Sequence, residues 1–295
     1  MADSASPRVI GIVGGSGIYD IDGLTETRWE KVSSPFGEPS DELLFGRLGD
    51  IRFVFLPRHG RGHRISPGEI NYRANIDALK RAGVTDVLSL GAVGSLREAL
   101  YPGTFVLVDQ FIDRTFARTK SFFGTGLVAH VSMAHPVCER LRGGLEGGAE
   151  ALGIPLHMGG TYLAMEGPQF SSLAESELYR SWGCHVIGMT AMPEAKLARE
   201  AELCYASVAM VTDYDCWHPD HDNVTVDAII GVLLGNADRA RSLVKAVAPG
   251  LATHAGPCPH GCQTALDNAI ITAPEARDPA LVARLGAVAG RALGG

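Results

Sequence analysis

Short apolar runs that end in small or polar residues recur along the chain. Residues 9–13 lead into the glycine-rich stretch 14–17, and residues 86–90 lead into Gly91. Runs of this length, rich in β-branched side chains and bounded by turn residues, are typical of buried strands. The same pattern predicts strands over 54–56, 104–108, 185–187 and 206–211.

Segments with apolar residues at helical spacing separate some of these strands. Residues 73–82 and 193–201 fit short helices, and residues 224–247 fit a long amphipathic helix. The apolar positions of the long helix are Val226, Ile229, Ile230, Leu233 and Leu234. The order of strands and helices predicts an α/β protein with a largely parallel or mixed sheet.

The chain beyond about residue 250 is rich in Ala, Gly and Pro, and it fits two further helices over 264–271 and 279–293. Neither an internal repeat nor a low-complexity linker interrupts the pattern. We therefore expect residues 1–295 to form a single domain with a C-terminal helical extension.

The composition is that of a globular protein with little affinity for large polyanions. Hydrophobic residues make up 46%, charged residues 20%, and the net charge is -7. Without a basic excess we expect neither general nucleic-acid binding nor membrane-surface binding. Residues 1–7 are unlike a secretory signal. We therefore expect a cytoplasmic setting, in which the six cysteines are free thiols.

Two carboxylates follow the strand predicted over 206–211. Asp213 and Asp215 would stand at its C-terminal end, where open α/β sheets bind ligands. Residues two apart in extended backbone face the same side. Both carboxylates would then reach one pocket, where one takes a proton and both accept hydrogen bonds. A solvated loop after the strand is the alternative.

Residues 14–17 carry groups suited to an anion. The stretch lacks the third glycine of a dinucleotide fingerprint, because Asp20 occupies that place, and no P-loop lysine follows. Its N–H groups and the Ser16 hydroxyl can hold a single phosphate. A plain tight turn explains the stretch equally well.

Arg58 and His59 follow the strand predicted over 54–56. Arginine is the preferred bidentate partner of phosphate, His59 can donate to the same anion, and His63 lies four residues further on. A surface Arg-His pair is the alternative. Additional donors at strand ends are Gly91, Ala92 and Thr190. Convergence of four strand ends on one anion favours a phosphate site.

Residues 165–171 combine a thioether, a carboxylate and an aromatic ring. Glu166 can accept hydrogen bonds from a vicinal diol, and Phe170 can cover a flat ring. Met189 supplies a second thioether. Ordinary core packing explains Phe170 and the methionines as well.

Cys258 and Cys262 form the one cluster with metal-binding or redox potential. Their spacing is C-x3-C rather than C-x2-C, and no second pair follows. A zinc site would need ligands from elsewhere in the chain. We expect no bound metal, and whether the two cysteines pair stays open.

Together these motifs resemble the purine nucleoside phosphorylase superfamily, of the trimeric type. Further matching segments, in order along the chain, are residues 71–75, 94–98, 109–115, 193–194 and 209–217. The resemblance implies a twisted mixed β-sheet surrounded by helices. It also implies a homotrimer with sites near subunit interfaces, and reversible cleavage of a nucleoside by phosphate, with no other cofactor.

The resemblance also implies roles for particular residues. The implied phosphate site is Ser16, Arg58, His59, Gly91, Ala92 and Thr190. The implied nucleoside contacts are Met189, Phe170, Asp213 and Asp215, of which the two aspartates are catalytic. Ser171 and Val226 match positions that shape specificity. His63 and His130, the latter from a neighbouring subunit, would approach the 5' end of the nucleoside.

The expected nucleoside is S-methyl-5'-thioadenosine. A carboxylate at 213 accepts a hydrogen bond from a 6-amino group, whereas a 6-carbonyl suits the two-way hydrogen bonding of Asn. Phosphorolysis of a 6-oxopurine nucleoside or of methylthioinosine is the alternative. A non-enzymatic Rossmann-type nucleotide-binding module is a more remote one, against which the missing third glycine counts.

Two glycines depart from the pattern of the family. Relatives often carry Ser or Thr in place of Gly91, and Asn in place of Gly188. The missing hydroxyl at 91 would leave only a backbone N–H for phosphate. Both missing side chains would widen the sugar side of the pocket.

Overall fold

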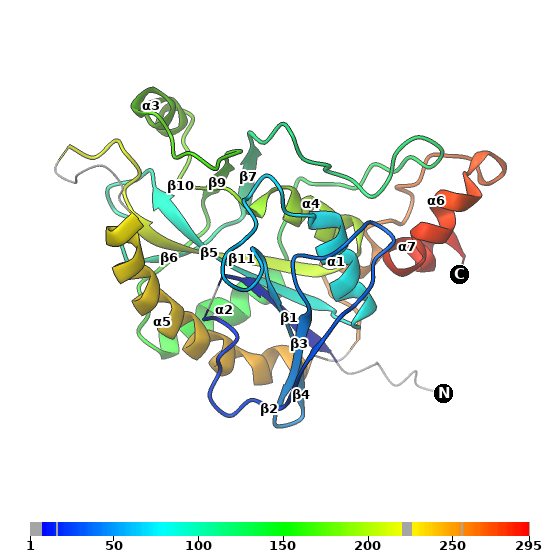
Figure 1. The fold of residues 1–295 in the computed structure, drawn as a ribbon, viewed down its shortest axis with the longest axis horizontal. Coiled ribbons are helices and arrows are strands. Elements are labelled where there is room, and N and C mark those ends of the chain that lie inside the picture. Colours follow the sequence, from blue (N-terminus) through cyan, green and yellow to red (C-terminus); the bar gives the residue numbers. More distant parts are fainter. Residues whose placement is uncertain (1–7, 16, 220–225, 255, 295) are drawn as a thin grey trace.

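The computed structural model describes residues 8–15, 17–219, 226–254 and 256–294, and for residues 226–230 only the backbone. Figure 1 shows a twisted sheet with helices packed on both of its faces. The 11 strands form parallel and antiparallel pairs, which confirms the expected mixed α/β architecture. No helix in the described part of the chain combines the length and apolarity needed to cross a bilayer.

The strands are β1 (Val9–Gly14), β2 (Thr25–Glu30), β3 (Leu43–Leu48), β4 (Ile51–Pro57), β5 (Asp86–Ser95), β6 (Phe105–Leu107), β7 (Gln110–Asp113), β8 (Leu156–Met158), β9 (Thr161–Ala164), β10 (Val186–Gly188) and β11 (Cys204–Asp213). The helices are α1 (Tyr72–Arg81), α2 (Glu139–Ala151), α3 (Leu173–Ser181), α4 (Ala191–Glu200), α5 (Val226–Ala252), α6 (Pro279–Arg284) and α7 (Gly286–Leu293), with short 3-10 turns at Cys262–Thr264 and Pro274–Ala276.

The alternation of side chains along β1 divides the core into two layers. Val9 and Val13 join an apolar cluster with residues of α1, α4 and α7. Ile10 and Ile12 point to the other face and join a cluster with residues of α2 and α5. Because successive strand residues face opposite sides, one apolar run supplies both layers.

Strand β5 organises the sheet around the candidate site. Its first part pairs with β1 on one side, up to Ser89, and with β11 on the other. Its last residues, Gly94 and Ser95, pair with β10 instead of β1. The edge between Leu90 and Val93 therefore faces a gap where β1 and β10 diverge, and such a switch in strand neighbours is where open sheets bind ligands.

The strands predicted from apolar runs are all present, and β5 continues to Ser95 beyond its predicted end. The helix predicted over 264–271 is wrong. Asn268 adopts a left-handed backbone conformation with φ 60, and Ile270 bridges to Ala129. The helix predicted over 279–293 is divided at Leu285 into α6 and α7. Strands β2, β3 and β7 to β9, and helices α2 and α3, were not predicted.

Candidate active site

A cavity of about 760 Å³ lies in the gap between β1 and β10. Loop and helix residues complete its walls. Its lining includes Gly15, Ile18, Arg58, His59, His63, Leu90, Gly91, Ala92, Val93, Gly94, Met165, Phe170, Met189, Thr190, Met210, Thr212, Asp213, Asp215, Leu233 and Ala237. Most of the residues predicted as a site are thus brought together, although they come from segments far apart in the sequence.

Arg58 is held by a carboxylate that the sequence did not reveal. Its Nε donates to Glu194 Oε2 over 2.9 Å and its Nη2 to Glu194 Oε1 over 3.2 Å, and both residues are buried. Burial alone would lower the pKa of Arg58, but Glu194 raises it. The bidentate face of the guanidinium is therefore occupied. Only Nη1, which donates to the Leu90 carbonyl over 3.1 Å, keeps a second N–H for a ligand.

His59 is neutral at physiological pH in this setting. Burial lowers its pKa to about 4. Its Nδ1 lies 2.9 Å from the Ile65 carbonyl, which can only accept, so Nδ1 carries the proton. Nε2 is then an acceptor, and it can accept a hydrogen bond from the O–H of a monoprotonated oxyanion rather than donate to it. The ring stacks on His63 at 4.2 Å between centroids.

Glycine and hydroxyl groups complete this end of the cavity. A Cβ built at Gly91 would lie 3.7 Å from Arg58 Nη1 and 4.0 Å from Thr190 Oγ1. Gly91 therefore faces both predicted anion donors. Ser16 lies outside the described residues, but its neighbour Gly15 lines the cavity.

Gly188 leaves no extra room, in contrast to our expectation. A Cβ at this position would lie 2.0 Å from the hydroxyl oxygen of Tyr162, a buried residue of β9. The backbone and hydroxyl of Thr190 also act on that phenol. The tyrosine therefore takes the space that a larger residue at 188 would need.

Asp213 and Asp215 both reach the cavity, but not through simple alternation. Strand β11 ends at Asp213, and Asp215 follows in a left-handed conformation with φ 54. The N–H of Asp215 donates to Asp213 Oδ1 over 2.8 Å, and the Thr212 hydroxyl donates to Asp213 Oδ2 over 2.6 Å. Gly94 permits this approach, since a Cβ there would lie 2.9 Å from Asp213 Oδ1.

Burial favours the protonated form of both acids. It raises the pKa of Asp213 above the ordinary value, although the hydrogen bonds from Thr212 and Asp215 oppose the rise. Burial also raises the pKa of Asp215, and the charge of Asp213 adds to that shift. Asp215 Oδ2 is buried and has no hydrogen-bond partner. The pair can hold a proton and offer it to a ligand.

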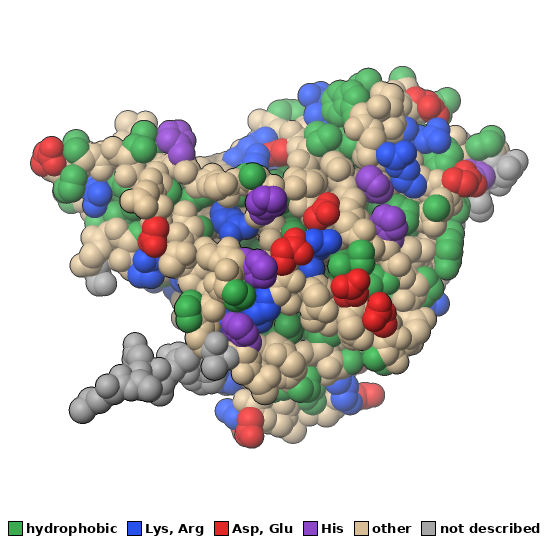
Figure 2. All heavy atoms as spheres, turned by 180° about the vertical axis from the view of Figure 1, so that it is seen from behind, with side chains coloured by type: hydrophobic (Ala, Val, Ile, Leu, Met, Phe, Trp, Pro, Cys, Tyr) green, Lys and Arg blue, Asp and Glu red, His purple; other side chains and the backbone are tan. Residues whose placement is uncertain are grey.

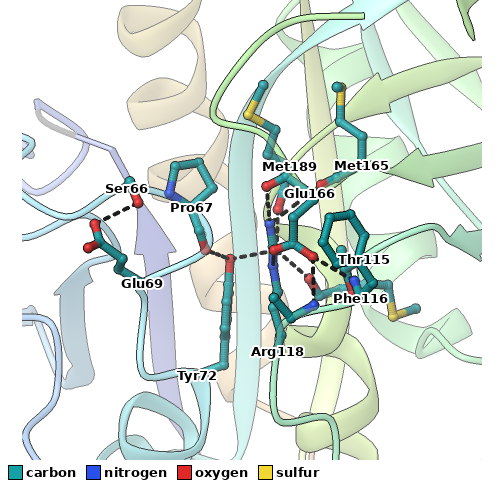
Figure 3. A network of polar contacts seen from close by, with 12 residues as sticks. Ser66, Pro67, Glu69, Tyr72, Thr115, Phe116, Arg118, Met165, Glu166 and Met189 are labelled. Atoms are coloured by element: carbon teal, nitrogen blue, oxygen red, sulfur yellow. Dashed lines mark hydrogen bonds and ion pairs between the residues drawn. The ribbon is translucent and has the colours of Figure 1, made fainter.

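A buried arginine fixes the wall that carries Met189. Figure 3 shows Arg118 between Tyr72 and Glu166, with Met189 and Met165 beside it. Arg118 Nε donates to Glu166 Oε1 over 2.8 Å, and Nη1 donates to the Tyr72 hydroxyl and to the Met189 carbonyl. Glu166 also accepts from two backbone N–H groups of residues 116 and 117. Its carboxylate is therefore engaged in holding this wall.

Two of the described residues predicted for the site, His130 and Ser171, do not line the cavity of this chain. His130 is exposed, and its N–H donates to the Ala269 carbonyl. The Ser171 hydroxyl contacts the sulfur of Met165 at 3.7 Å and also acts on the carboxyl group of Asp215. Val226 is the first residue of α5, and its side chain lies outside the described part. Leu233 and Ala237, about two and three turns further along the same helix, line the cavity.

Besides the lining residues Leu233 and Ala237, the residues that the sequence did not indicate hold the lining in place. Glu194, Arg118 and Tyr162 each act through a neighbour that a motif had already indicated. Glu194 stands in the matched pair 193–194, but nothing in the sequence connects it to Arg58. Only the fold brings residues 136 positions apart into one ion pair.

The sequence matches a model of the phosphorylase superfamily over residues 9–249. A protein of Rhodospirillum rubrum named S-methyl-5'-thioadenosine phosphorylase is 64% identical over 294 residues, and the match covers 100% of each chain. A protein of Bradyrhizobium diazoefficiens with the same name is 63% identical, over 97% of this chain and 99% of that one.

Solved structures of phosphorylases also match this chain. A methylthioadenosine phosphorylase from an antarctic soil metagenomic library matches with a TM-score of 0.90 and 45% identity, over 96% of this chain and 99% of that one. A mutant adenosine/methylthioadenosine phosphorylase of Schistosoma mansoni, in complex with methylthioadenosine, matches with a TM-score of 0.78 and 37% identity, over 84% of this chain and 93% of that one.

Proposed function

Because the chain belongs to the phosphorylase superfamily, we propose that it is a phosphate-dependent pentosyltransferase acting on S-methyl-5'-thioadenosine. The products are adenine and 5-methylthioribose 1-phosphate, in purine and methionine salvage. The observation that carries the proposal is the pairing, in one cavity, of an anion-binding end with a carboxyl group whose pKa is raised. Inorganic phosphate is the co-substrate, and no resident cofactor takes part.

The phosphate site is formed by Arg58 Nη1, the Thr190 hydroxyl and backbone N–H groups near Gly91, together with Ser16. The Glu194 ion pair neutralises most of the Arg58 charge but fixes the direction of the remaining N–H. Neutral His59 accepts a hydrogen bond through Nε2 from the O–H of a monoprotonated phosphate. Donors held in place before binding cost no reorganisation when charge develops in the transition state.

Cleavage begins at the bond between C1' and purine N9. The bonding electrons move into the purine, and C1' acquires oxocarbenium character. A phosphate oxygen, held beside the sugar, then forms the new bond to C1'. The negative phosphate also stabilises the cationic sugar before that bond is complete.

Asp213 activates the leaving group. Burial keeps its carboxyl group protonated to higher pH than an ordinary aspartic acid, so it can donate a proton to N7 as the C1'–N9 bond breaks. Adenine then leaves as a neutral molecule. The carboxylate that remains accepts a hydrogen bond from the 6-amino group, and Asp215 supports Asp213 through its N–H.

The walls of the cavity match the remaining parts of the nucleoside. Met189 and Phe170 cover the sugar and the purine ring. The apolar residues Leu233 and Ala237 of α5 face the 5' substituent. A methylthio group is favoured over a hydroxyl there by about 1–3 kcal/mol, so adenosine is a slower substrate. Ser171, Val226 and His63 adjust this preference.

The active form is a cytoplasmic homotrimer in which His130 reaches the site of a neighbouring subunit. Its exposed position outside this chain's cavity supports that role. Large apolar side chains are also exposed, notably Phe116 at 82% and Leu173 at 59%. Subunit association would cover them. Sedimentation of the active enzyme tests this, and an active monomer at micromolar concentration would contradict it.

A panel of nucleosides tests the substrate assignment. Release of the free base is measured from methylthioadenosine, adenosine, 5'-deoxyadenosine and inosine, each with and without phosphate. We expect methylthioadenosine to react fastest and inosine slowest. If inosine is cleaved faster than methylthioadenosine, the enzyme is a 6-oxopurine nucleoside phosphorylase.

A further inference from the structure

Four buried cysteines converge on one point away from the cavity. The Sγ atoms of Cys138, Cys204, Cys258 and Cys262 all lie within 4.8 Å of one another. It is the only group of three or more possible metal ligands found among the residues that the structure describes. None of the four lines the cavity described above.

The four sulfurs come from three separate elements. Cys138 is the N-cap residue of α2, Cys204 is the first residue of β11, and Cys258 and Cys262 follow α5. Gly261, with φ 67, lets the short loop between the last two turn back on itself. The C-x3-C pair seen in the sequence thus acquires two further sulfurs, from residues that no local pattern connects to it.

This geometry fits a single tetrahedral ion. Zinc binds thiolate at about 2.3 Å, which puts the four sulfurs roughly 3.8 Å apart. The Sγ atoms of Cys138 and Cys258 lie 3.5 Å apart. Disulfides would need only two separate pairs, not mutual approach of all four. An iron–sulfur cluster of two or four irons would hold some of the sulfurs further apart, because they would bind different iron atoms.

The arginines next to the four cysteines carry positive charge that neighbouring carboxylates neutralise only in part. Arg140 and Arg8 share one buried carboxylate, Asp86, so these three groups keep one net positive charge. Arg140 Nε and Nη1 are also buried without hydrogen-bond partners. Arg199 Nη1 lies 4.0 Å from Cys262 Sγ. Four thiolates around Zn²⁺ carry a net charge of about -2, which two guanidinium groups would balance.

Gln263 provides further support for sulfur ligands. Its Oε1 accepts from the N–H of Cys258 over 2.6 Å, and its Nε2 lies 3.5 Å from Cys204 Sγ. The amide therefore connects the loop to the start of β11 and places a donor against a sulfur. Such outer contacts orient the ligands of metal sites.

We propose that Cys138, Cys204, Cys258 and Cys262 bind one Zn²⁺ as a structural site. Binding displaces the four thiol protons to solvent, and no coordination position stays open for substrate, so the ion has no part in catalysis. This replaces our expectation, from the sequence, of a loop without metal.

The site would anchor the chain that follows α5. Beyond Cys262, this segment bridges to the loop before α2 through Ala129 and Ile270, and the N–H of His130 donates to Ala269. The metal would therefore fix the position of His130 relative to β11, whose far end carries Asp213. Loss of the ion should loosen the C-terminal segment first.

Elemental analysis of the full-length protein tests the proposal. The protein is produced with zinc in the medium and purified without a histidine tag or chelator. We expect about one zinc per chain. A mercurial reagent titrated into the wild-type protein should release zinc into a colorimetric indicator in step with the modification of these four thiols.

Two variants separate the cluster from a general effect of cysteine loss. Cys262→Ser should lower zinc content about fivefold or more. Cys184→Ser removes a buried cysteine from a different cluster and should leave it unchanged. Zinc-free wild-type protein, iron in place of zinc, an intact mass lacking two hydrogens per cysteine pair, or full zinc content in Cys262→Ser would each overturn the assignment.

Discussion

At the scale of single residues, the environment of Asp213 combines burial with two short hydrogen bonds. Burial raises the pKa of the carboxyl group, while the Thr212 hydroxyl and the Asp215 N–H oppose that shift. The side chain is thus held in one orientation and keeps its proton to a higher pH than an ordinary aspartic acid. Both properties suit a positioned acid.

Replacing this acid should separate binding from catalysis. Asp213→Asn removes the transferable proton but keeps the size of the side chain. We expect adenine release to slow by roughly 10²–10⁴. The relative preference should shift towards 6-oxopurines, because the amide can donate to O6. Steady-state assays with methylthioadenosine and inosine measure both effects, and an unchanged rate with methylthioadenosine would remove Asp213 from the mechanism.

The pH dependence of the same pair of proteins gives a second prediction. The reaction needs the protonated carboxyl group, so kcat/KM of the wild type should fall as pH rises through the raised pKa of Asp213. Asp213→Asn has no such group and should lack this decline. Taking the ratio of the two proteins at each pH cancels the ionisation of phosphate itself. A ratio that does not change with pH would contradict the assignment.

Sequence reasoning found lining residues more readily than their supports. Arg58, Thr190 and Asp213 stand at strand ends, where composition and position identify them. The sequence did not indicate that Glu194 pairs with Arg58, because a long-range ion pair produces no periodic pattern along the chain. The pairing changes the interpretation of Arg58: truncating it would leave a buried carboxylate unpaired, at a cost of about 3–5 kcal/mol, in addition to weakening phosphate binding.

At the scale of elements, two strand-end glycines differ in what surrounds them. Gly91 of β5 faces open space next to Arg58 Nη1 and Thr190, whereas Gly188 of β10 faces the hydroxyl of Tyr162. From the sequence we expected both missing side chains to widen the sugar side of the pocket. The structure instead shows space for a side chain at Gly91, whereas the Tyr162 hydroxyl fills that space at Gly188.

The same substitution at both glycines tests this difference. Gly91→Ser should fold normally and lower KM for phosphate by about threefold to tenfold, because its hydroxyl adds a hydrogen bond. Gly188→Ser should lower the free energy of unfolding by about 1–3 kcal/mol, since its Cβ would overlap Tyr162. Phosphate titrations and urea unfolding measure these effects. Equal stability of the two variants would contradict our account.

Elements were missed where another requirement overrides propensity. Helix α2 contains four glycines, and a Cβ at Gly148 would lie 2.3 Å from a methyl group of Val247 in α5. Its glycines thus permit close helix packing. Because glycine has a low helix propensity, the sequence does not predict a helix there. Strand β2 is largely exposed and lacks an apolar run. Strands β7 to β9 are too short for a periodic signal.

At the scale of the whole molecule, charged groups are distributed over the surface. On the face seen in Figure 2, acidic and basic side chains alternate rather than forming one basic field. This agrees with the net charge of -7.

Inside the molecule, Glu200 at the end of α4 accepts hydrogen bonds from the Ser121 hydroxyl and the Phe122 N–H, each over 2.7 Å.

Burial raises the pKa of Glu200 to about 7. In the unfolded chain this acid ionises near its ordinary value, so its stabilising effect is full below that value. The effect is lost as pH rises through about 7, where the folded protein must hold a buried carboxylate. The molecule should therefore lose stability between mildly acidic and mildly basic pH.

Removing this charge should reduce the decrease in the free energy of unfolding as pH rises. Glu200→Gln keeps the acceptor for Phe122 and cannot ionise. Relative to wild type, we expect it to gain about 1–3 kcal/mol in free energy of unfolding between pH 5 and pH 8. Denaturant unfolding at the two pH values measures the gain. Glu150→Gln, at an exposed position of α2, is the control, and equal pH responses of both variants would refute the role of Glu200.

In the proposed reaction phosphate, not water, receives the sugar. Wild-type enzyme is given methylthioadenosine with a limiting, known amount of inorganic phosphate. Adenine is quantified by chromatography, and phosphate and its sugar ester by phosphorus NMR. We expect one phosphate to be consumed and one sugar 1-phosphate to be formed per adenine. Release of adenine should stop once phosphate is exhausted. Continued release of adenine together with free 5-methylthioribose would contradict it and identify a hydrolase.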